Sequence, residues 1–341
     1  FSQAKQSALQ QCESAETLTC EFLVQSLLQN LSFVKDGHFS IAQQSAAPRI
    51  CPFFYREVAF MKTEDGYQSE DGKQVESVEG YEDLDQLFRR SISSEGELVY
   101  YPVVLKEVED PSLQGTYQNN EPLVVRYQGG ETQTLTAEAF EMYDELLPER
   151  TVTEEVEGIP ILRLQFFDSQ GSRERREFLE VHADAPVQII DLRTNGGGFW
   201  QDVQSVMMDY VGQAVPTNSV EVDAWTGNYQ DEQDQFAENE KLLIVLTGKY
   251  TASAAEQFVD AIHNVENVLI VGENTNGCIL TAAGSSYLPN SNAPMVLGAN
   301  LLHVFPGEGF FEELRGLYPD IWVPAGEAEE LVIKLVEQLN R

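Results

Sequence analysis

Basic residues are scarce in this chain of 341 residues, and long apolar runs are absent. Lys and Arg together number 21 against 56 Asp and Glu, which gives a formal net charge of −35 at pH 7. Nucleic-acid binding needs clustered Lys and Arg to neutralise phosphates, so we expect no nucleic-acid partner. No apolar run approaches the roughly 20 residues of a membrane-spanning helix, so we expect no such segment.

Cysteine is also rare, with only Cys12, Cys20, Cys51 and Cys278. Their spacing is not that of a zinc site, and no Cys-x-x-Cys occurs. Cys12 and Cys20 are close enough to close a short loop as a disulfide in an oxidising compartment, and buried free thiols are the alternative. The pairing of the four cysteines is left open, and no metal or organic cofactor is implied.

What the chain does contain indicates a globular protein. Hydrophobic residues make up 42% and aromatic residues 10%, and the length is enough for two or three domains. Strong acidity favours solubility and fits a secreted protein. We therefore expect an extracytoplasmic location, periplasmic or secreted, and the sequence leaves the oligomeric state open.

The pattern of the chain changes twice, which predicts three parts. Residues 1–50 form an N-terminal helical segment that ends in a turn and a short strand at 38–41. Residues 51–150 are β-rich, with a short helix expected at 84–91 and a Gly-Gly hairpin within 122–135. Residues 151–341 alternate strands with helices, which predicts βαβ units and a largely parallel sheet. The fold class is α/β in this last part and α+β overall.

Ser253 occupies the most informative position of the third part. The apolar run 242–247 predicts a strand, a Gly-containing turn follows, and 254–262 has a helical pattern. A hydroxyl at the start of a helix lies near free backbone amides, which favour negative charge that develops on a nucleophile or its substrate. The alternative is that Ser253 only caps the helix.

A nucleophilic serine needs a base, and the chain has four histidines. His263 is ten residues past Ser253 on the same predicted helix, almost three turns away and out of hydrogen-bond reach. His182 lies in a polar loop and His303 in a predicted strand, where structural roles are expected. His38 follows an Asp-Gly turn at the start of a strand, a position from which a side chain can project into a cleft.

The segment Asn195-Gly-Gly-Gly198 follows a buried-looking strand at 187–193. Ligands of open α/β sheets bind at the carboxyl ends of the strands, and glycines let backbone amides approach a ligand closely. An ordinary strand-to-helix turn is the alternative. A phosphate-binding loop is excluded because its lysine and its glycine spacing are missing.

Four motifs occur in order over residues 158–330: 189–198, Thr251-Ala-Ser-Ala-Ala-Glu256, Val271-Gly-Glu-Asn-Thr-Asn-Gly277 and 316–323. Together they resemble the catalytic domain of the carboxyl-terminal-processing and tricorn-type serine peptidases. Asp36-Gly-His38 is similar to the histidine motif of the tricorn-like branch, which has a serine where this chain has Gly37. Residues 75–80 and 84–91 resemble the end of a PDZ-like insert.

The resemblance implies a catalytic domain of the ClpP/crotonase-like type over 151–341 and a degenerate PDZ-like insert within 51–150. It also implies Ser253 as nucleophile. In the processing-protease branch a lysine follows the third motif as the base, but Cys278 stands there. A thiol with a pKa near 8.5 is a poor substitute. The tricorn-like assignment is therefore favoured.

That assignment makes His38 the base and Glu313 the residue that orients it, with adjacent Glu312 as the alternative. Backbone amides of Gly197 and Ala254 would form the oxyanion hole. The expected function is a serine peptidase that hydrolyses a peptide or protein substrate through an acyl-enzyme. The alternative is a catalytically weak or inactive peptide- or ligand-binding protein on the same fold, as in the interphotoreceptor retinoid-binding protein, which resembles this family.

Overall fold

The structure of the chain is a computed structural model. It describes residues 2–34, 36–42, 45, 47–109, 113–145, 147–223, 237–279, 282–287, 294–298, 301–305, 309–310 and 313–339. Of these, residues 221, 223, 282–287, 297–298, 301–305 and 309–310 are described by their backbone alone. No helix within the described ranges is long and apolar enough to cross a membrane.

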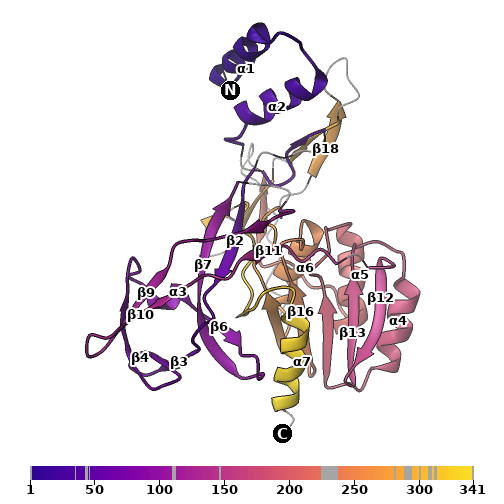
Figure 1. Cartoon of the computed structure of the whole chain (residues 1–341). Coiled ribbons are helices and arrows are strands. Elements are labelled where there is room, and N and C mark those ends of the chain that lie inside the picture. Colours follow the sequence, from indigo (N-terminus) through magenta and orange to yellow (C-terminus); the bar gives the residue numbers. More distant parts are fainter. Residues whose placement is uncertain are drawn as a thin grey trace.

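A six-stranded sheet forms the centre of one lobe (Figure 1). In spatial order it contains β12 (Thr151–Val156), β13 (Ile159–Leu164), β14 (Val187–Asp191), β16 (Leu242–Thr247), β17 (Val268–Gly272) and β22 (Ile321–Trp322). Only the β12–β13 pair is antiparallel. The four helices of this lobe are α4 (Ser172–Val181), α5 (Trp200–Val211), α6 (Ala254–Ile262) and α7 (Ala328–Leu339). The predicted βαβ alternation and the mixed α/β class are confirmed.

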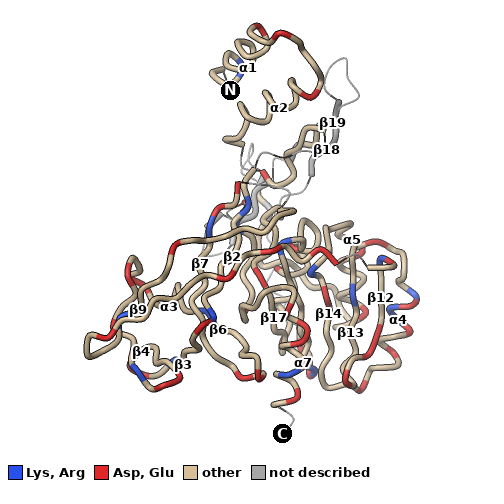
Figure 2. Tube along the Cα trace, viewed as in Figure 1, with Lys and Arg blue, Asp and Glu red and all other residues tan. Residues whose placement is uncertain are grey.

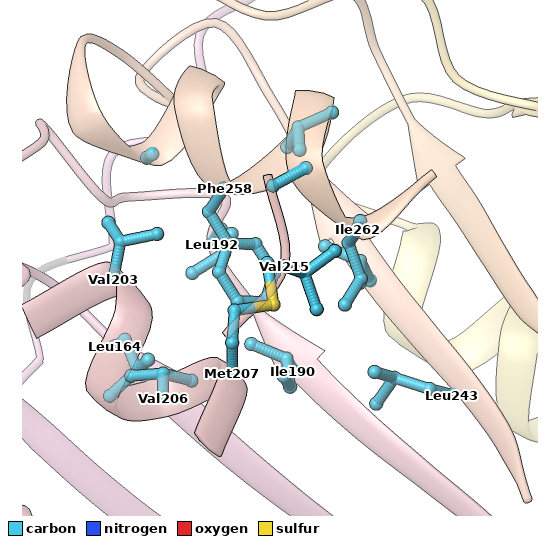
Figure 3. Packing of buried hydrophobic residues seen from close by; sticks show 14 of the residues in the cluster. Leu164, Ile190, Leu192, Val203, Val206, Met207, Val215, Leu243, Phe258 and Ile262 are labelled. Atoms are coloured by element: carbon cyan, nitrogen blue, oxygen red, sulfur yellow. The ribbon is translucent and has the colours of Figure 1, made fainter. Parts of the chain in front are cut away.

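The two faces of this sheet carry separate apolar cores, because successive side chains of a strand point to opposite sides. Ile190 of β14 packs with α5 and α6, whereas its neighbour Ile189 packs with α7 on the other face. Figure 3 shows the first of these cores, where Met207 of α5 and Phe258 of α6 meet the sheet. Both faces are covered, so these strands read as continuous apolar runs in the sequence.

The second lobe is almost entirely β. It contains β2 (Arg49–Phe54), β3 (Phe60–Thr63), β4 (Gly66–Ser69), β5 (Val75–Val78), β6 (Phe88–Ile92), β7 (Leu98–Val108), β8 (Thr116–Tyr117), β9 (Leu123–Tyr127), β10 (Thr132–Leu135) and β11 (Phe140–Glu141). The main apolar cluster of this lobe has buried members that all lie between Cys51 and Phe140, and Ala59, Val99 and Tyr101 form a smaller one. The hairpin expected within 122–135 is the β9–β10 pair.

One expectation for this lobe is wrong. The helix predicted over 84–91 is a single turn, α3 (Leu84–Leu87), and the chain then enters β6. Phe88 and Ile92 are buried on that strand, so pairing with β7 and burial of apolar side chains override the local helical pattern. The PDZ-like insert is not confirmed, and the domain boundaries at 50 and 150 stay predictions.

The N-terminal segment forms a helical hairpin, α1 (Ser2–Ser14) and α2 (Cys20–Asn30), which stands above both lobes in Figure 1. Below it, β1 (Ser40–Ile41) pairs with β19 (Pro294–Gly298), which pairs with β18 (Ala282–Tyr287). A further sheet joins β15 (Val220–Asp223), β20 (Leu301–Phe305) and β21 (Gly309–Phe310). The start of the chain is therefore held by segments about 250 residues later.

Candidate active site

Ser253 lies where β16 has ended and α6 begins. Its backbone has φ 54° and ψ −119°, a conformation that residues with a side chain rarely adopt. Such a conformation costs on the order of 1–3 kcal/mol and persists only where surrounding contacts impose it. Ser253 thus lies at the carboxyl edge of the parallel sheet.

The glycine turn lies directly against the loop that carries Ala252 and Ser253. The N–H of Ala252 donates to the carbonyl of Asn195 at 3.0 Å. A methyl group on Gly197, which has φ 113°, would lie 2.9 Å from Cβ of Ser253, so only glycine fits there. The N–H of Gly197 donates to Oδ1 of Asn195 at 2.9 Å, so this amide is engaged inside its own turn.

His38 reaches Ser253 across 215 positions of sequence. Its Nε2 lies 3.2 Å from Oγ of Ser253, within hydrogen-bond distance. The loop that carries it is fixed from both sides, since the N–H of His38 donates to Oδ1 of Asp36 at 2.8 Å and the next side chain, Phe39, is buried against α2. The packing of the N-terminal segment therefore sets the position of the imidazole.

The surroundings of His38 hold its pKa below the ordinary value of 6.5. Burial is the largest cause, because it disfavours the charged imidazolium, and the positive charge of Arg49 acts in the same direction. The carboxylates of Asp36 and Glu256 oppose this shift without reversing it. His38 is therefore neutral at pH 7, the form that can accept a proton from Ser253.

Glu313 lies beside this loop and contacts its backbone. The N–H of Gly37 donates to Oε2 of Glu313 at 3.0 Å. Nδ1 of His38 is buried and has no hydrogen-bond partner among the described residues. The structure thus brings Glu313 to the residue before His38 but forms no bond between its carboxylate and the imidazole. Glu312 lies outside the described residues.

Cys278 is buried against the histidine loop. A methyl group on Gly37 would lie only 2.1 Å from Cβ of Cys278, so no side chain fits at position 37. This contact gives a physical reason for the glycine where the tricorn-like motif has serine. Burial raises the pKa of the Cys278 thiol well above its usual range, so the thiol stays neutral. All four cysteines are free in the structure.

Glu256 is a site residue to which the sequence reasoning gave no role. It is fully buried, and its carboxylate accepts the backbone N–H groups of Ser253 at 3.1 Å, Gly277 at 2.8 Å and Cys278 at 2.8 Å. It also accepts the hydroxyl of Thr275. Glu256 therefore joins the backbone of Ser253 to the 275–278 loop, which packs on Gly37. The Ser-x-x-Glu spacing of a capping box was the signal for it.

Lys249, which follows the end of β16, is also buried. Its ammonium donates to the carbonyl of Thr275 and lies 3.4 Å from the carbonyl of Asn276. Burial lowers its pKa to about 8. Lys249 therefore supports the 275–278 loop from inside, and no hydrogen bond joins it to Ser253.

The other histidines lie away from this cluster as far as they are described. Nδ1 of His263 lies 2.8 Å from the carbonyl of Val259 at the end of α6, and His182 follows α4 near Glu155. His303 is on β20, and its side chain lies outside the description. Within the described ranges, no group of three or more His, Cys, Asp or Glu residues is arranged to hold a metal ion.

Comparison with known proteins gives one family match and several similar structures. Residues 158–323 match the model of peptidase family S41. The structure of mature CPAF complexed with lactacystin is similar over 99% of this chain and 92% of that chain, with a TM-score of 0.51 and 14% identity. A putative peptidase from Parabacteroides merdae is similar over 99% and 87%, with a TM-score of 0.47 and 16% identity. At such identities the similarity to CPAF is evidence for the fold.

Proposed function

Residues 158–323 belong to peptidase family S41, which makes the chain a serine-type peptidase, and from this premise we propose a mechanism that uses Ser253, His38 and Glu313. Ser253 is the nucleophile, His38 the general base and Glu313 the residue that orients the imidazole. The observation that carries this proposal is the 3.2 Å contact between Nε2 of His38 and Oγ of Ser253. It joins a neutral base to a serine held in a strained conformation.

The chemistry proceeds through an acyl-enzyme. Oγ of Ser253 attacks the peptide carbonyl while Nε2 of His38 takes the hydroxyl proton. The resulting imidazolium then gives that proton to the leaving amine. Water attacks the ester in the second half with His38 again as base, which frees the acid product and returns the proton to Ser253. Glu313 stabilises the imidazolium once its carboxylate turns from Gly37 toward Nδ1 of His38.

The oxyanion requires donors near Ser253, and we assign them to the backbone amides of Ala254 and Gly197. The amide of Ala254 is the first of α6 and has no hydrogen-bond acceptor among the described residues. The amide of Gly197 is bonded to Asn195, so in this proposal it exchanges that acceptor for the oxyanion. A lone donor of this kind is worth about 3 kcal/mol in the transition state.

The residues at and near the position of the processing-protease lysine argue against a lysine as the base. Cys278 holds the position of the lysine of the processing-protease branch, and its buried thiol is neutral. Lys249 donates its protons to the carbonyls of Thr275 and Asn276. These two groups support the loop, and they leave His38 as the described base within reach of Ser253.

Covalent labelling by a fluorophosphonate tests the nucleophile. We expect the wild-type chain to be labelled at Ser253, and Ser253→Ala to lose the label. Ser94→Ala is the matched control, because Ser94 is exposed in the turn between β6 and β7. Equal labelling of wild type and Ser253→Ala would refute the assignment. A wild-type chain that binds peptides but is never labelled would favour the binding-protein alternative.

Paired variants separate the two adjacent glutamates. Glu313→Gln is expected to lower the labelling rate on the order of 100-fold or more, since a neutral amide cannot stabilise the imidazolium. Glu312→Gln is the matched control and is expected to change the rate less than about 3-fold. The reverse order of these effects would move the orienting role to Glu312.

A further inference from the structure

Three arginines of the described chain are buried: Arg49, Arg175 and Arg193. Two of them have carboxylate partners. Arg175 is paired with Asp209, and Arg193 is paired with Asp191 and Glu329. Arg49 differs, because no hydrogen bond or ion pair joins its guanidinium to any described residue, and its Nη1 is fully buried without a partner.

An unpaired buried guanidinium is energetically costly. Removing a charge from water costs several kcal/mol unless a counter-charge and hydrogen bonds replace the lost hydration. The chain contains 56 Asp and Glu residues, so carboxylate partners are abundant in it. None of the described carboxylates reaches Arg49, which leaves its guanidinium available to a carboxylate of a bound ligand.

The position of Arg49 places it at the candidate active site. It is the first residue of β2. The N–H of the next residue, Ile50, donates to the carbonyl of Leu314 at 3.3 Å, and Leu314 follows Glu313. The carbonyl of Ile50 accepts from Asn274 at 3.0 Å. The charge of Arg49 is felt by both His38 and Cys278, whose pKa values it lowers.

We propose that Arg49 is the receptor for a carboxylate of the peptide substrate. The planar guanidinium presents parallel N–H donors that match a carboxylate in a bidentate pair, and 7% of the residue's surface remains exposed for that contact. The carboxylate is either the free end of a peptide chain or the side chain of Asp or Glu. This assignment of substrate class rests on the proposed peptidase function.

Because the net charge of the protein is strongly negative, a preference for carboxylate-bearing peptides would indicate a specific local cation. A chain with a net charge of −35 repels anionic peptides at long range. Selective binding of carboxylate-bearing peptides must therefore come from a local cation that overcomes this background. Arg49 is positioned to supply it beside the reacting groups.

Peptide capture on the full-length Ser253→Ala protein tests the proposal without turnover. The probes are two random octapeptide libraries of equal composition, one with free carboxyl ends and one with amidated ends. Mass spectrometry identifies the retained peptides. We expect about 10-fold or greater enrichment of free-acid peptides if the chain end is bound. If a side chain is bound, we expect the same enrichment of Asp or Glu over Asn or Gln within the amide library.

The second variant, Ser253→Ala with Arg49→Gln, is expected to lose either enrichment. Arg49→Lys in the same Ser253→Ala background keeps the positive charge but lacks the planar guanidinium, so we expect it to retain only part of the enrichment. This variant keeps a cation at position 49 and therefore tests the proposal even if Arg49→Gln folds poorly. Enrichment that survives Arg49→Gln, or no enrichment on Ser253→Ala, would overturn the proposal. Hydrolysis by the wild type is measured separately: capture without hydrolysis refutes the chemistry of Ser253 and leaves Arg49 in place.

Discussion

At the scale of single residues, Glu256 connects the parts of the candidate site. Its carboxylate accepts three backbone N–H groups and one hydroxyl from the two loops on either side of Ser253. The strained backbone of Ser253 and the contact of Cys278 with Gly37 both depend on where these loops lie. We therefore regard Glu256 as a positioning residue that acts through Ser253 and His38.

The variant Glu256→Gln tests this role. The amide keeps the shape of the side chain but replaces one acceptor oxygen by a donor that faces N–H groups. We expect a loss of about 3 kcal/mol in the free energy of unfolding, because hydrogen bonds to a buried charge are lost. Urea denaturation measures it. Glu330→Gln is the control, since Glu330 is in an exposed pair with Lys334 worth less than about 1 kcal/mol. Equal effects of the two variants would contradict the positioning role.

The residues of the site differ in how far the sequence could identify them. Ser253 and the glycine turn were recognisable from a strand–turn–helix pattern and from ordered motifs, because local sequence forms both. His38 and Ser253 are 215 positions apart, and only the motif resemblance linked them. Arg49 carried no sequence signal, because its significance lies in the absence of a described partner once the chain is folded.

At the scale of elements, α6 links the apolar core to the loops of the candidate site. Phe258 of α6 stacks on Phe167 with ring centroids 5.5 Å apart. Phe167 accepts the N–H of Phe199 and donates to the carbonyl of Gly197, so it holds the glycine turn from behind. Core packing and the position of the turn amides are thus coupled through one pair of aromatic rings.

Phe258→Ala is expected to destabilise the fold by about 3–5 kcal/mol, since it leaves a cavity beneath the turn. The labelling rate of Ser253 should fall at temperatures where the variant is still folded, because Phe167 loses its support. Thermal denaturation and fluorophosphonate labelling measure the two effects. Val181→Ala, at a side chain that is 78% exposed, is the control and should change neither. Unaltered labelling by folded Phe258→Ala would show that core and turn are uncoupled.

The elements themselves were predicted well wherever local pattern and tertiary packing agree. Strand β16 and helix α6 have the predicted bounds, because a buried parallel strand leaves a continuous apolar run and the residues that follow the turn have a helical pattern. The region 84–91 was mispredicted, since the pairing of β6 with β7 is a long-range contact that local sequence does not reveal. The pairing of β1 with β19 was equally invisible.

At the scale of the whole molecule, the excess of negative charge is spread over both lobes. Figure 2 shows acidic positions in both lobes and fewer basic ones. Like charges at this density repel one another and oppose the compact state. The extracytoplasmic location expected from this composition stays a prediction, as does the absence of a cofactor.

Salt should therefore stabilise the protein. Raising NaCl from about 10 mM to about 150 mM shortens the screening length from about 30 Å to about 8 Å, which weakens the repulsion between surface carboxylates. We expect the melting temperature to rise by several degrees in this range, as measured by differential scanning calorimetry. Choline chloride should have the same effect if screening is the cause. A melting temperature that is unchanged or lower at high salt would contradict this view of the surface.

The most direct test of the account is the pH dependence of fluorophosphonate labelling at Ser253. The rate depends on the deprotonated fraction of the base, so its acidic limb reports the pKa of that base. Burial and Arg49 hold the pKa of His38 below 6.5, whereas the pKa of Lys249 is about 8. We predict a midpoint below 6.5 that disappears in His38→Gln together with most of the rate. A midpoint near 8, or a profile that His38→Gln leaves unchanged, would show that His38 is not the base.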